Sequence, residues 1–168
     1  MKTSYKITLC AILCSLAVIS FIIENLFPPF VLPGARMGVS NIFILLSAMI
    51  LGWKYSIATL VVKVLLGSLF SGNFSAVMYS LPAGLIALAI ELILIYATKR
   101  VSIVCISVAG AVVNVTVQNV IFCLITDTPE YLSYLPYLAL TSIFAGLTIG
   151  FATYLILRKV KKLNANKT

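Results

Sequence analysis

Long apolar runs separated by short polar turns constrain this chain more than any other feature of its sequence. Hydrophobic residues occupy 62% of the 168 positions, whereas soluble domains are usually about half apolar. Runs of ~20 apolar residues match the thickness of a bilayer, and their continuity favours helices over the alternating strands of a membrane barrel. The sequence therefore predicts an all-α integral membrane protein.

Turn signals divide the chain into six predicted membrane-spanning helices within one domain that covers residues 1–168. Prolines, glycines and short polar clusters mark the ends of the helices. The spans are expected at about 7–26, 38–51, 55–70, 76–98, 101–125 and 135–157, followed by a basic cytoplasmic tail at 158–168. The first run follows two lysines, as in a signal peptide, but its length and the spans behind it predict an uncleaved helix.

The distribution of cations predicts the orientation of this six-helix bundle. With both termini inside the cell, ten of the 12 Lys and Arg residues are cytoplasmic: Lys2, Lys6, Lys54, Lys99, Arg100, Arg158, Lys159, Lys161, Lys162 and Lys167. The turn before the sixth span instead carries Asp127 and Glu130. The positive-inside rule thus predicts an N-in, C-in protein of the cell membrane. Because the cations gather at helix ends, the expected surrounding is the lipid bilayer, and no nucleic-acid partner is expected.

Two ionisable side chains, Lys63 and Glu91, fall within predicted spans. At ~1.5 Å per residue both lie about 12–14 Å from the cytoplasmic surface. A charge at such depth costs roughly 2.5–3.5 kcal/mol on insertion scales and needs a partner or a wet cavity. Two interpretations follow. Lys63 and Glu91 form a buried ion pair, or Lys63 faces a cavity and neutralises an anionic ligand.

A polar stripe follows one face of the predicted fifth span. Ser107, Ala111, Asn114 and Gln118 are separated by four, three and four positions, a spacing that keeps side chains on the same helix face. Amides in hydrocarbon either bond to a neighbouring helix or line a polar site. Both interpretations of the stripe remain open.

A shaped loop, Pro33 to Asn41, leads into the second predicted span. Arg36 and Asn41 flank the expected start of that helix, where free N–H groups and the helix dipole favour anions. We therefore expect a ligand site in the outer half of the bundle. Arg36 and the loop would close its roof, and Asn114 would close its floor.

Small residues four positions apart mark three spans: Ala11 and Ser15, Ala83 and Ala87, and Ser142, Gly146 and Gly150. Such spacing lets two helix backbones approach closely. The faces either pack inside the bundle or dock a second membrane subunit.

Several of these elements together carry a resemblance to a known family. They are Glu24, the stretch Pro33-Gly34-Ala35-Arg36-Met37-Gly38-Val39-Ser40-Asn41-Ile42, Lys63, Gly72, Gly84, Gly110, Ala111, Asn114 and Gln118. The chain resembles the Gx transporter family, also labelled heptaprenyl diphosphate synthase component I, which is related to the substrate-binding S subunits of energy-coupling factor (ECF) importers. The family commonly has Arg where Lys63 stands, and a His-Asn pair in place of Asn114 and Val115.

The resemblance implies an S-type subunit of six helices that captures a small molecule from outside, with the first loop as a lid. It implies that the first helix, through Ala11 and Ser15, docks a membrane coupling subunit, and that two cytoplasmic ATPases supply the energy. The candidate ligand-binding residues are Arg36, Asn41, Lys63, Asn114 and Gln118. Their two cations favour a small anionic molecule, vitamin-like or related to isoprenoids.

The rival prediction is an enzyme or an enzyme subunit. Condensation of prenyl diphosphates needs Mg²⁺ held by clustered carboxylates, but the four acidic residues include no adjacent pair and no DDxxD motif. The chain also has no His and no GxxxxGK[ST] loop for ATP. We predict no catalytic activity, no cofactor and no metal site for this chain. The alternative is a non-catalytic membrane subunit of a heptaprenyl diphosphate synthase.

Overall fold

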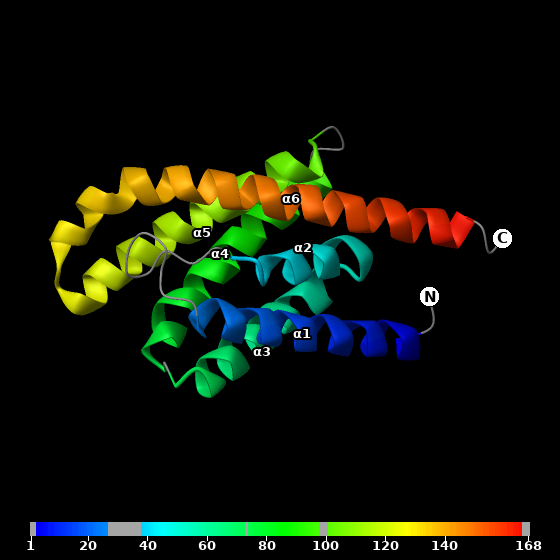
Figure 1. The fold of residues 1–168 in the computed structure, drawn as a ribbon, viewed down its shortest axis with the longest axis horizontal. Coiled ribbons are helices and arrows are strands. Elements are labelled where there is room, and N and C mark those ends of the chain that lie inside the picture. Colours follow the sequence, from blue (N-terminus) through cyan, green and yellow to red (C-terminus); the bar gives the residue numbers. More distant parts are fainter. Residues whose placement is uncertain (1–2, 27–37, 73, 98–100, 166–168) are drawn as a thin grey trace.

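The computed structural model describes residues 3–26, 38–72, 74–97 and 101–165, and these ranges fold almost entirely into helices (Figure 1). In chain order the elements are α1 (Thr3–Leu26), α2 (Asn41–Ile50), α3 (Trp53–Phe70), α4 (Ser75–Ala97), α5 (Ile103–Thr126), the 3₁₀-helix η1 (Pro129–Tyr134) and α6 (Leu135–Ala165). The predicted all-α membrane class is confirmed.

The second predicted span differs from the expectation. Helix α2 has 10 residues, so it is only ~15 Å long, about half of the ~30 Å hydrocarbon core. Within the described ranges, five helices are long and apolar enough to cross a membrane, and α2 is not among them. Glycine turns bracket the helix, because Gly38 has a positive φ of 68° and Gly52 one of 98°. The predicted count of six spanning helices is therefore not confirmed, because the described residues form five helices of spanning length and one half-length helix, α2.

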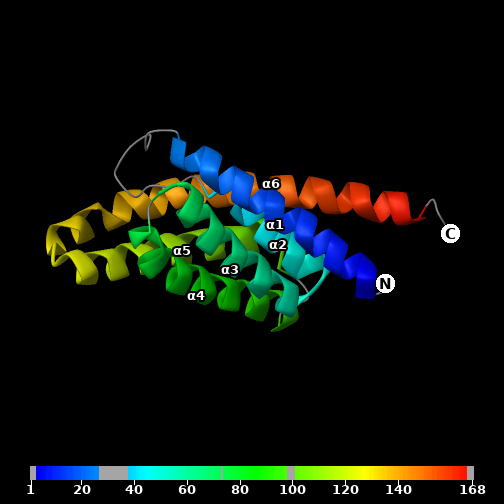
Figure 2. The ribbon, with the colours of Figure 1, turned by 90° about the horizontal axis from the view of Figure 1, so that it is seen from below.

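Helix α2 occupies only the half of the bundle that is nearer the chain termini (Figures 1 and 2). It packs against α1, α3 and α6, and its first residue, Asn41, contacts the middle of α3 through Lys63. From there α2 runs toward the end of the molecule that carries both chain ends (Figures 1 and 2). The start of this helix therefore lies deep between the longer helices.

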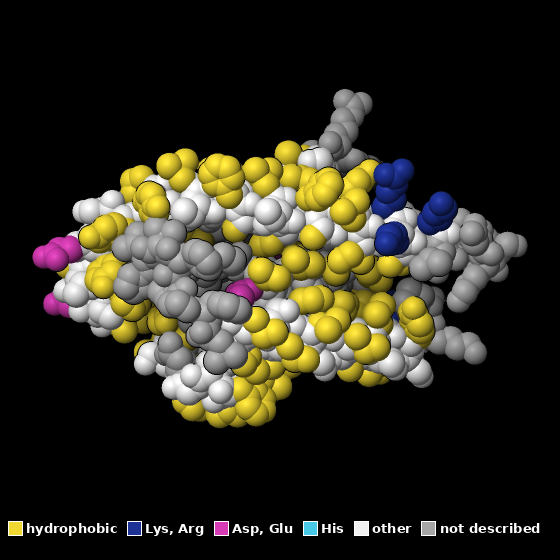
Figure 3. All heavy atoms as spheres, in the orientation of Figure 1, with side chains coloured by type: hydrophobic (Ala, Val, Ile, Leu, Met, Phe, Trp, Pro, Cys, Tyr) yellow, Lys and Arg dark blue, Asp and Glu magenta, His cyan; other side chains and the backbone are white. Residues whose placement is uncertain are grey.

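Charge is distributed along the long axis of the bundle as the cation count predicts. On the face that Figure 3 shows, Lys and Arg side chains gather at the end where the chain termini lie, whereas acidic side chains lie at the opposite tip and near the middle. Helix α6 continues to Ala165, so most of the predicted basic tail is helical. Lys, Arg and Leu are good helix formers, and the tail contains no Gly or Pro that would end the helix.

This charge distribution leads to a topology prediction. In a variant without the four native cysteines, Glu130→Cys should react with a membrane-impermeant maleimide in intact cells, because η1 is expected to face outward. Lys162→Cys should react only after the cells are permeabilised. The opposite labelling pattern would mean that the orientation is inverted.

The small residues of α6 bring its backbone against α5. A Cβ atom built on Gly146 would lie 2.7 Å from the Cα of Val108, and one on Gly150 would lie 2.7 Å from the Cα of Val104. On α4, Ala83 is also fully buried. The small-residue faces of α4 and α6 therefore pack inside the bundle.

We expect Gly146→Leu to lower the thermal midpoint of the purified protein. The new side chain would meet the backbone of α5, which cannot rotate away, and overpacking of this kind typically costs about 1–3 kcal/mol. Thr148→Leu is the matched control, since Thr148 is exposed on the same helix. Equal midpoints for the two variants would contradict the close packing of α5 and α6.

Candidate functional site

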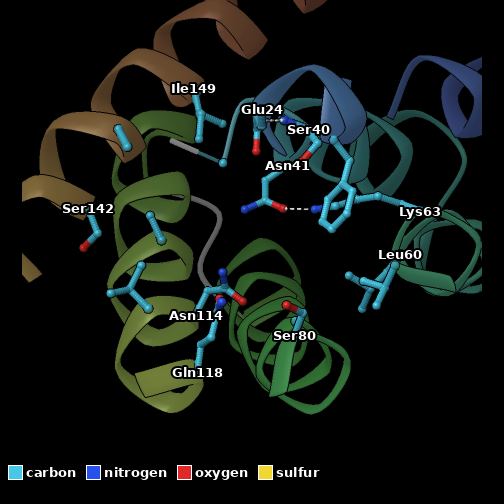
Figure 4. A pocket seen from close by; sticks show the side chains of 17 residues that line it. Glu24, Ser40, Asn41, Leu60, Lys63, Ser80, Asn114, Gln118, Ser142 and Ile149 are labelled. Atoms are coloured by element: carbon cyan, nitrogen blue, oxygen red, sulfur yellow. Dashed lines mark hydrogen bonds between the residues drawn. The ribbon is translucent and has the colours of Figure 1, made fainter. Parts of the chain in front are cut away.

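A polar cavity of about 50 Å³ lies in the middle of the helix bundle (Figure 4). Its lining comes from α1, α3, α4, α5 and α6, and from the first residue of α2 together with the turn before it. Its polar side chains include Glu24, Asn41, Lys63, Ser80, Asn114 and Gln118. The cavity has room for a few water molecules, and its polar walls are unusual for a site surrounded by apolar helices.

Lys63 is held at the cavity by Asn41. The Nζ of Lys63 donates a hydrogen bond of 2.6 Å to the Oδ1 of Asn41, and the Phe21 ring centroid lies 5.7 Å from the same nitrogen. The side chain of Lys63 is only 6% exposed. The buried ammonium of Lys63 therefore lies at the cavity wall, beside the Asn41 amide and the face of the Phe21 ring.

The predicted ion pair between Lys63 and Glu91 is not formed. Among the described residues, no Lys or Arg nitrogen lies within 4.0 Å of the carboxylate of Glu91. The ammonium is bonded to Asn41 instead, because the start of α2 lies at the depth of Lys63, which the sequence did not reveal.

The N-terminus of α2 already binds a carboxylate. The backbone N–H of Ser40 donates a 2.8 Å hydrogen bond to the Oε1 of Glu24 on α1 (Figure 4). A helix N-terminus favours negative charge, and a side chain of this chain supplies it here. An anionic ligand would therefore meet Lys63 rather than the end of α2.

The polar stripe of α5 faces the cavity. Asn114 and Gln118 both line it, and Figure 4 shows them on the same stretch of α5. Within the described part of the chain, neither side chain bonds to another side chain or to the backbone. This arrangement favours a polar site over hydrogen bonds between helices.

The structure brings together four of the five candidate ligand residues: Asn41, Lys63, Asn114 and Gln118. Arg36, with the predicted roof and lid, lies outside the described residues. Ala11 and Ser15 are not part of the cavity lining and are exposed on α1. In the described ranges, no group of three or more His, Cys, Asp or Glu side chains is placed to hold a metal ion.

The cavity wall also includes Ser80 and Ser142, which were not predicted as site residues. Ser80 lies two positions before Pro82, which interrupts α4, and its buried Oγ has no hydrogen-bond partner among the described residues. Ser142 lines the cavity from α6, although its spacing from Gly146 and Gly150 had suggested a helix-packing role. A proline within a membrane helix is a signal for unpaired polar groups nearby, and it would have pointed to Ser80.

Comparison with known proteins gives one family. Residues 13–156 match the family described as heptaprenyl diphosphate synthase component I. Comparisons with curated proteins and with solved structures return no match. The matched region runs from α1 to α6 and includes every described residue of the cavity wall. The chain therefore belongs to the heptaprenyl diphosphate synthase component I family.

Proposed function

We propose that this protein is the substrate-binding membrane subunit of an ECF-type importer in the cell membrane. The observation that supports the proposal most is the convergence of Asn41, Lys63, Asn114 and Gln118 on one cavity inside the bundle. Polar and charged groups are costly at this depth, and packing alone does not require them there. A membrane subunit that captures a polar solute does.

The lining favours a small molecule with an anionic group, either vitamin-like or related to isoprenoids. Lys63 supplies the positive charge, and the amides of Asn114 and Gln118 supply donors and acceptors for the remaining polar atoms. Small-molecule sites usually measure ~300–1,000 Å³, whereas the cavity measures about 50 Å³. Binding therefore requires the surrounding elements to move apart.

An outward face of α1 is the proposed docking surface for the membrane coupling subunit, which would connect this chain to cytoplasmic ATPases. Ala11 and Ser15 are both exposed, and the hydroxyl of Ser15 donates to the backbone oxygen of Ala11 at 3.0 Å. This internal bond satisfies the hydroxyl, so the face can lie against another apolar helix. By contrast, the small-residue faces of α4 and α6 pack against other helices inside the bundle.

The proposal is tested by identifying the proteins that co-purify with the tagged chain in mild detergent. We expect a membrane coupling subunit and ATPases, and we expect Ser15→Leu to reduce their recovery at least about tenfold, since a bulky side chain prevents close helix contact. Thr148→Leu is the control, because it adds the same side chain to an exposed position of α6. Equal recovery with both variants would rule out docking through this face.

The family name supports a second candidate, a non-catalytic membrane subunit of a heptaprenyl diphosphate synthase. The same purification separates the two functions. Recovery of a soluble prenyl synthase, without ATPases, would favour the accessory role. In that case the cavity would be expected to bind a prenyl diphosphate or its product.

A further inference from the structure

A second, smaller cavity, called the inner cavity below, lies beside the first. It has a volume of about 20 Å³ and is lined by Glu91, Ser107 and Gly110, among others. Asn41 and Asn114 line both cavities. The smaller cavity has room for one particle the size of a water molecule.

Glu91 is one of the residues that line the inner cavity. Glu91 is 9% exposed, and it packs directly on Gly110 of α5, where an added Cβ would overlap the carboxylate. Among the described residues, no hydrogen-bond donor or cationic nitrogen contacts its oxygens. Among the described residues, the structure thus holds a buried acid whose oxygens have no direct partner and that lines a cavity.

The positive charge of Lys63 acts electrostatically on Glu91, but the two side chains line different cavities. Lys63 lines the larger cavity but not the inner one, and its ammonium donates to Asn41. A carboxylate within a membrane span is costly without a counter-charge. Among the described residues no cationic nitrogen lies in direct contact with Glu91, so a cation in the inner cavity would be the contact partner that the carboxylate lacks there.

We propose that the inner cavity binds one monovalent cation, with Glu91 as its counter-ion and Na⁺ as the ion that fits best. One carboxylate balances one positive charge. The Ser107 hydroxyl and the Asn114 amide oxygen, which line the same space, are hard oxygen ligands of the kind that such ions prefer. Divalent ions are less suited, because Ca²⁺ takes six to eight oxygen ligands and Mg²⁺ demands a near-ideal octahedron.

This cation site goes beyond solute capture and does not depend on which partner the chain has. Asn41 and Asn114 contact both cavities, so an ion beside Glu91 would orient amides that also face the larger site. The bound ion would thereby favour one orientation of the Asn41 and Asn114 amides in the wall of the larger cavity.

The test uses purified protein in detergent and a buffer without alkali cations. NaCl replaces choline chloride at constant ionic strength and pH while the thermal midpoint is measured, and KCl is titrated in parallel. We expect Na⁺ to raise the midpoint in a saturable manner, by ~2–6 °C, and at lower concentrations than K⁺. Equilibrium binding of radioactive Na⁺ should give one ion per chain.

Glu91→Gln should abolish the Na⁺ response, and Glu130→Gln, the same change at an exposed position of η1, should retain it. Ser107→Ala should raise the half-saturating Na⁺ concentration about 2–10-fold. A parent protein without a Na⁺ response, or a Glu91→Gln variant that keeps the response, overturns the proposal. If Glu91→Gln does not fold, an unchanged half-saturating concentration in Ser107→Ala overturns it. These outcomes do not bear on solute capture, which is measured separately.

Discussion

Lys63→Met is expected to weaken binding of the small molecule that co-purifies with the parent protein by about 10–150-fold. The change removes the buried ammonium at the cavity wall, and a hydrogen bond to a charged group contributes ~1.5–3 kcal/mol. Methionine has a similar length and no charge, so it fills the space of the lysine stem. The measurement is a binding titration on protein whose folding at the assay temperature is verified by its thermal midpoint.

Lys63→Arg is the matched control, because it keeps the positive charge at the same position. We expect it to retain most of the affinity if charge is the main contribution of Lys63. A Lys63→Met protein that is folded and binds like the parent would show that the ammonium does not contact the ligand. Its hydrogen bond to Asn41 would then serve only to hold α2 against α3.

Gly67→Ala should destabilise the protein, because Gly67 packs against the ring of Phe21, a residue of the cavity wall. A Cβ atom on Gly67 would overlap the ring of Phe21, with ring atoms Cγ and Cε1 at 2.9 Å. Phe21 is 3% exposed, so the rigid ring has little space to move into. Overpacking at such a site typically costs about 1–3 kcal/mol, which should lower the thermal midpoint by several degrees.

A double-mutant cycle checks the cause of this loss. Phe21→Leu removes the ring atoms that the new Cβ would meet, so the loss in the double variant should be smaller than the sum of the two single losses. Because the Phe21 ring lies beside the ammonium of Lys63, Gly67→Ala should also weaken ligand binding. Additive losses would place the strain somewhere other than the contact between α1 and α3.

The helical class and most helix ends follow from the sequence, because apolar runs and turn formers have strong local effects. Gly52 has the positive φ of a helix stop, and Ser102 caps α5 by accepting a hydrogen bond from the N–H of Cys105. The start of α2 did not follow. Three residues of the predicted span, Gly38 to Ser40, form a turn that depends on Glu24 of another helix, and a single sequence does not show such a tertiary contact.

The candidate site shows the same division between local and tertiary information. The spacing on α5 is a local pattern, and it correctly placed Asn114 and Gln118 on one face, whereas the partner of Lys63 depends on how three helices meet. Equal depth favoured Glu91, but depth does not fix the rotation of each helix about its axis. The structure turns Lys63 toward Asn41 and the larger cavity, and Glu91 toward Gly110 and the smaller one.

The central claim is that the larger cavity holds a small polar solute, and mass spectrometry of bound small molecules tests it most directly. The parent protein and the variant Asn114→Leu/Gln118→Leu are purified in parallel and extracted. Thr148→Leu, which adds leucine outside the cavity, serves as the control. We predict that one small molecule is retained by the parent and by Thr148→Leu and is lost from the cavity variant, provided that all three proteins elute as folded species. Equal recovery from all three would contradict the claim, because the bound molecule would then lie elsewhere.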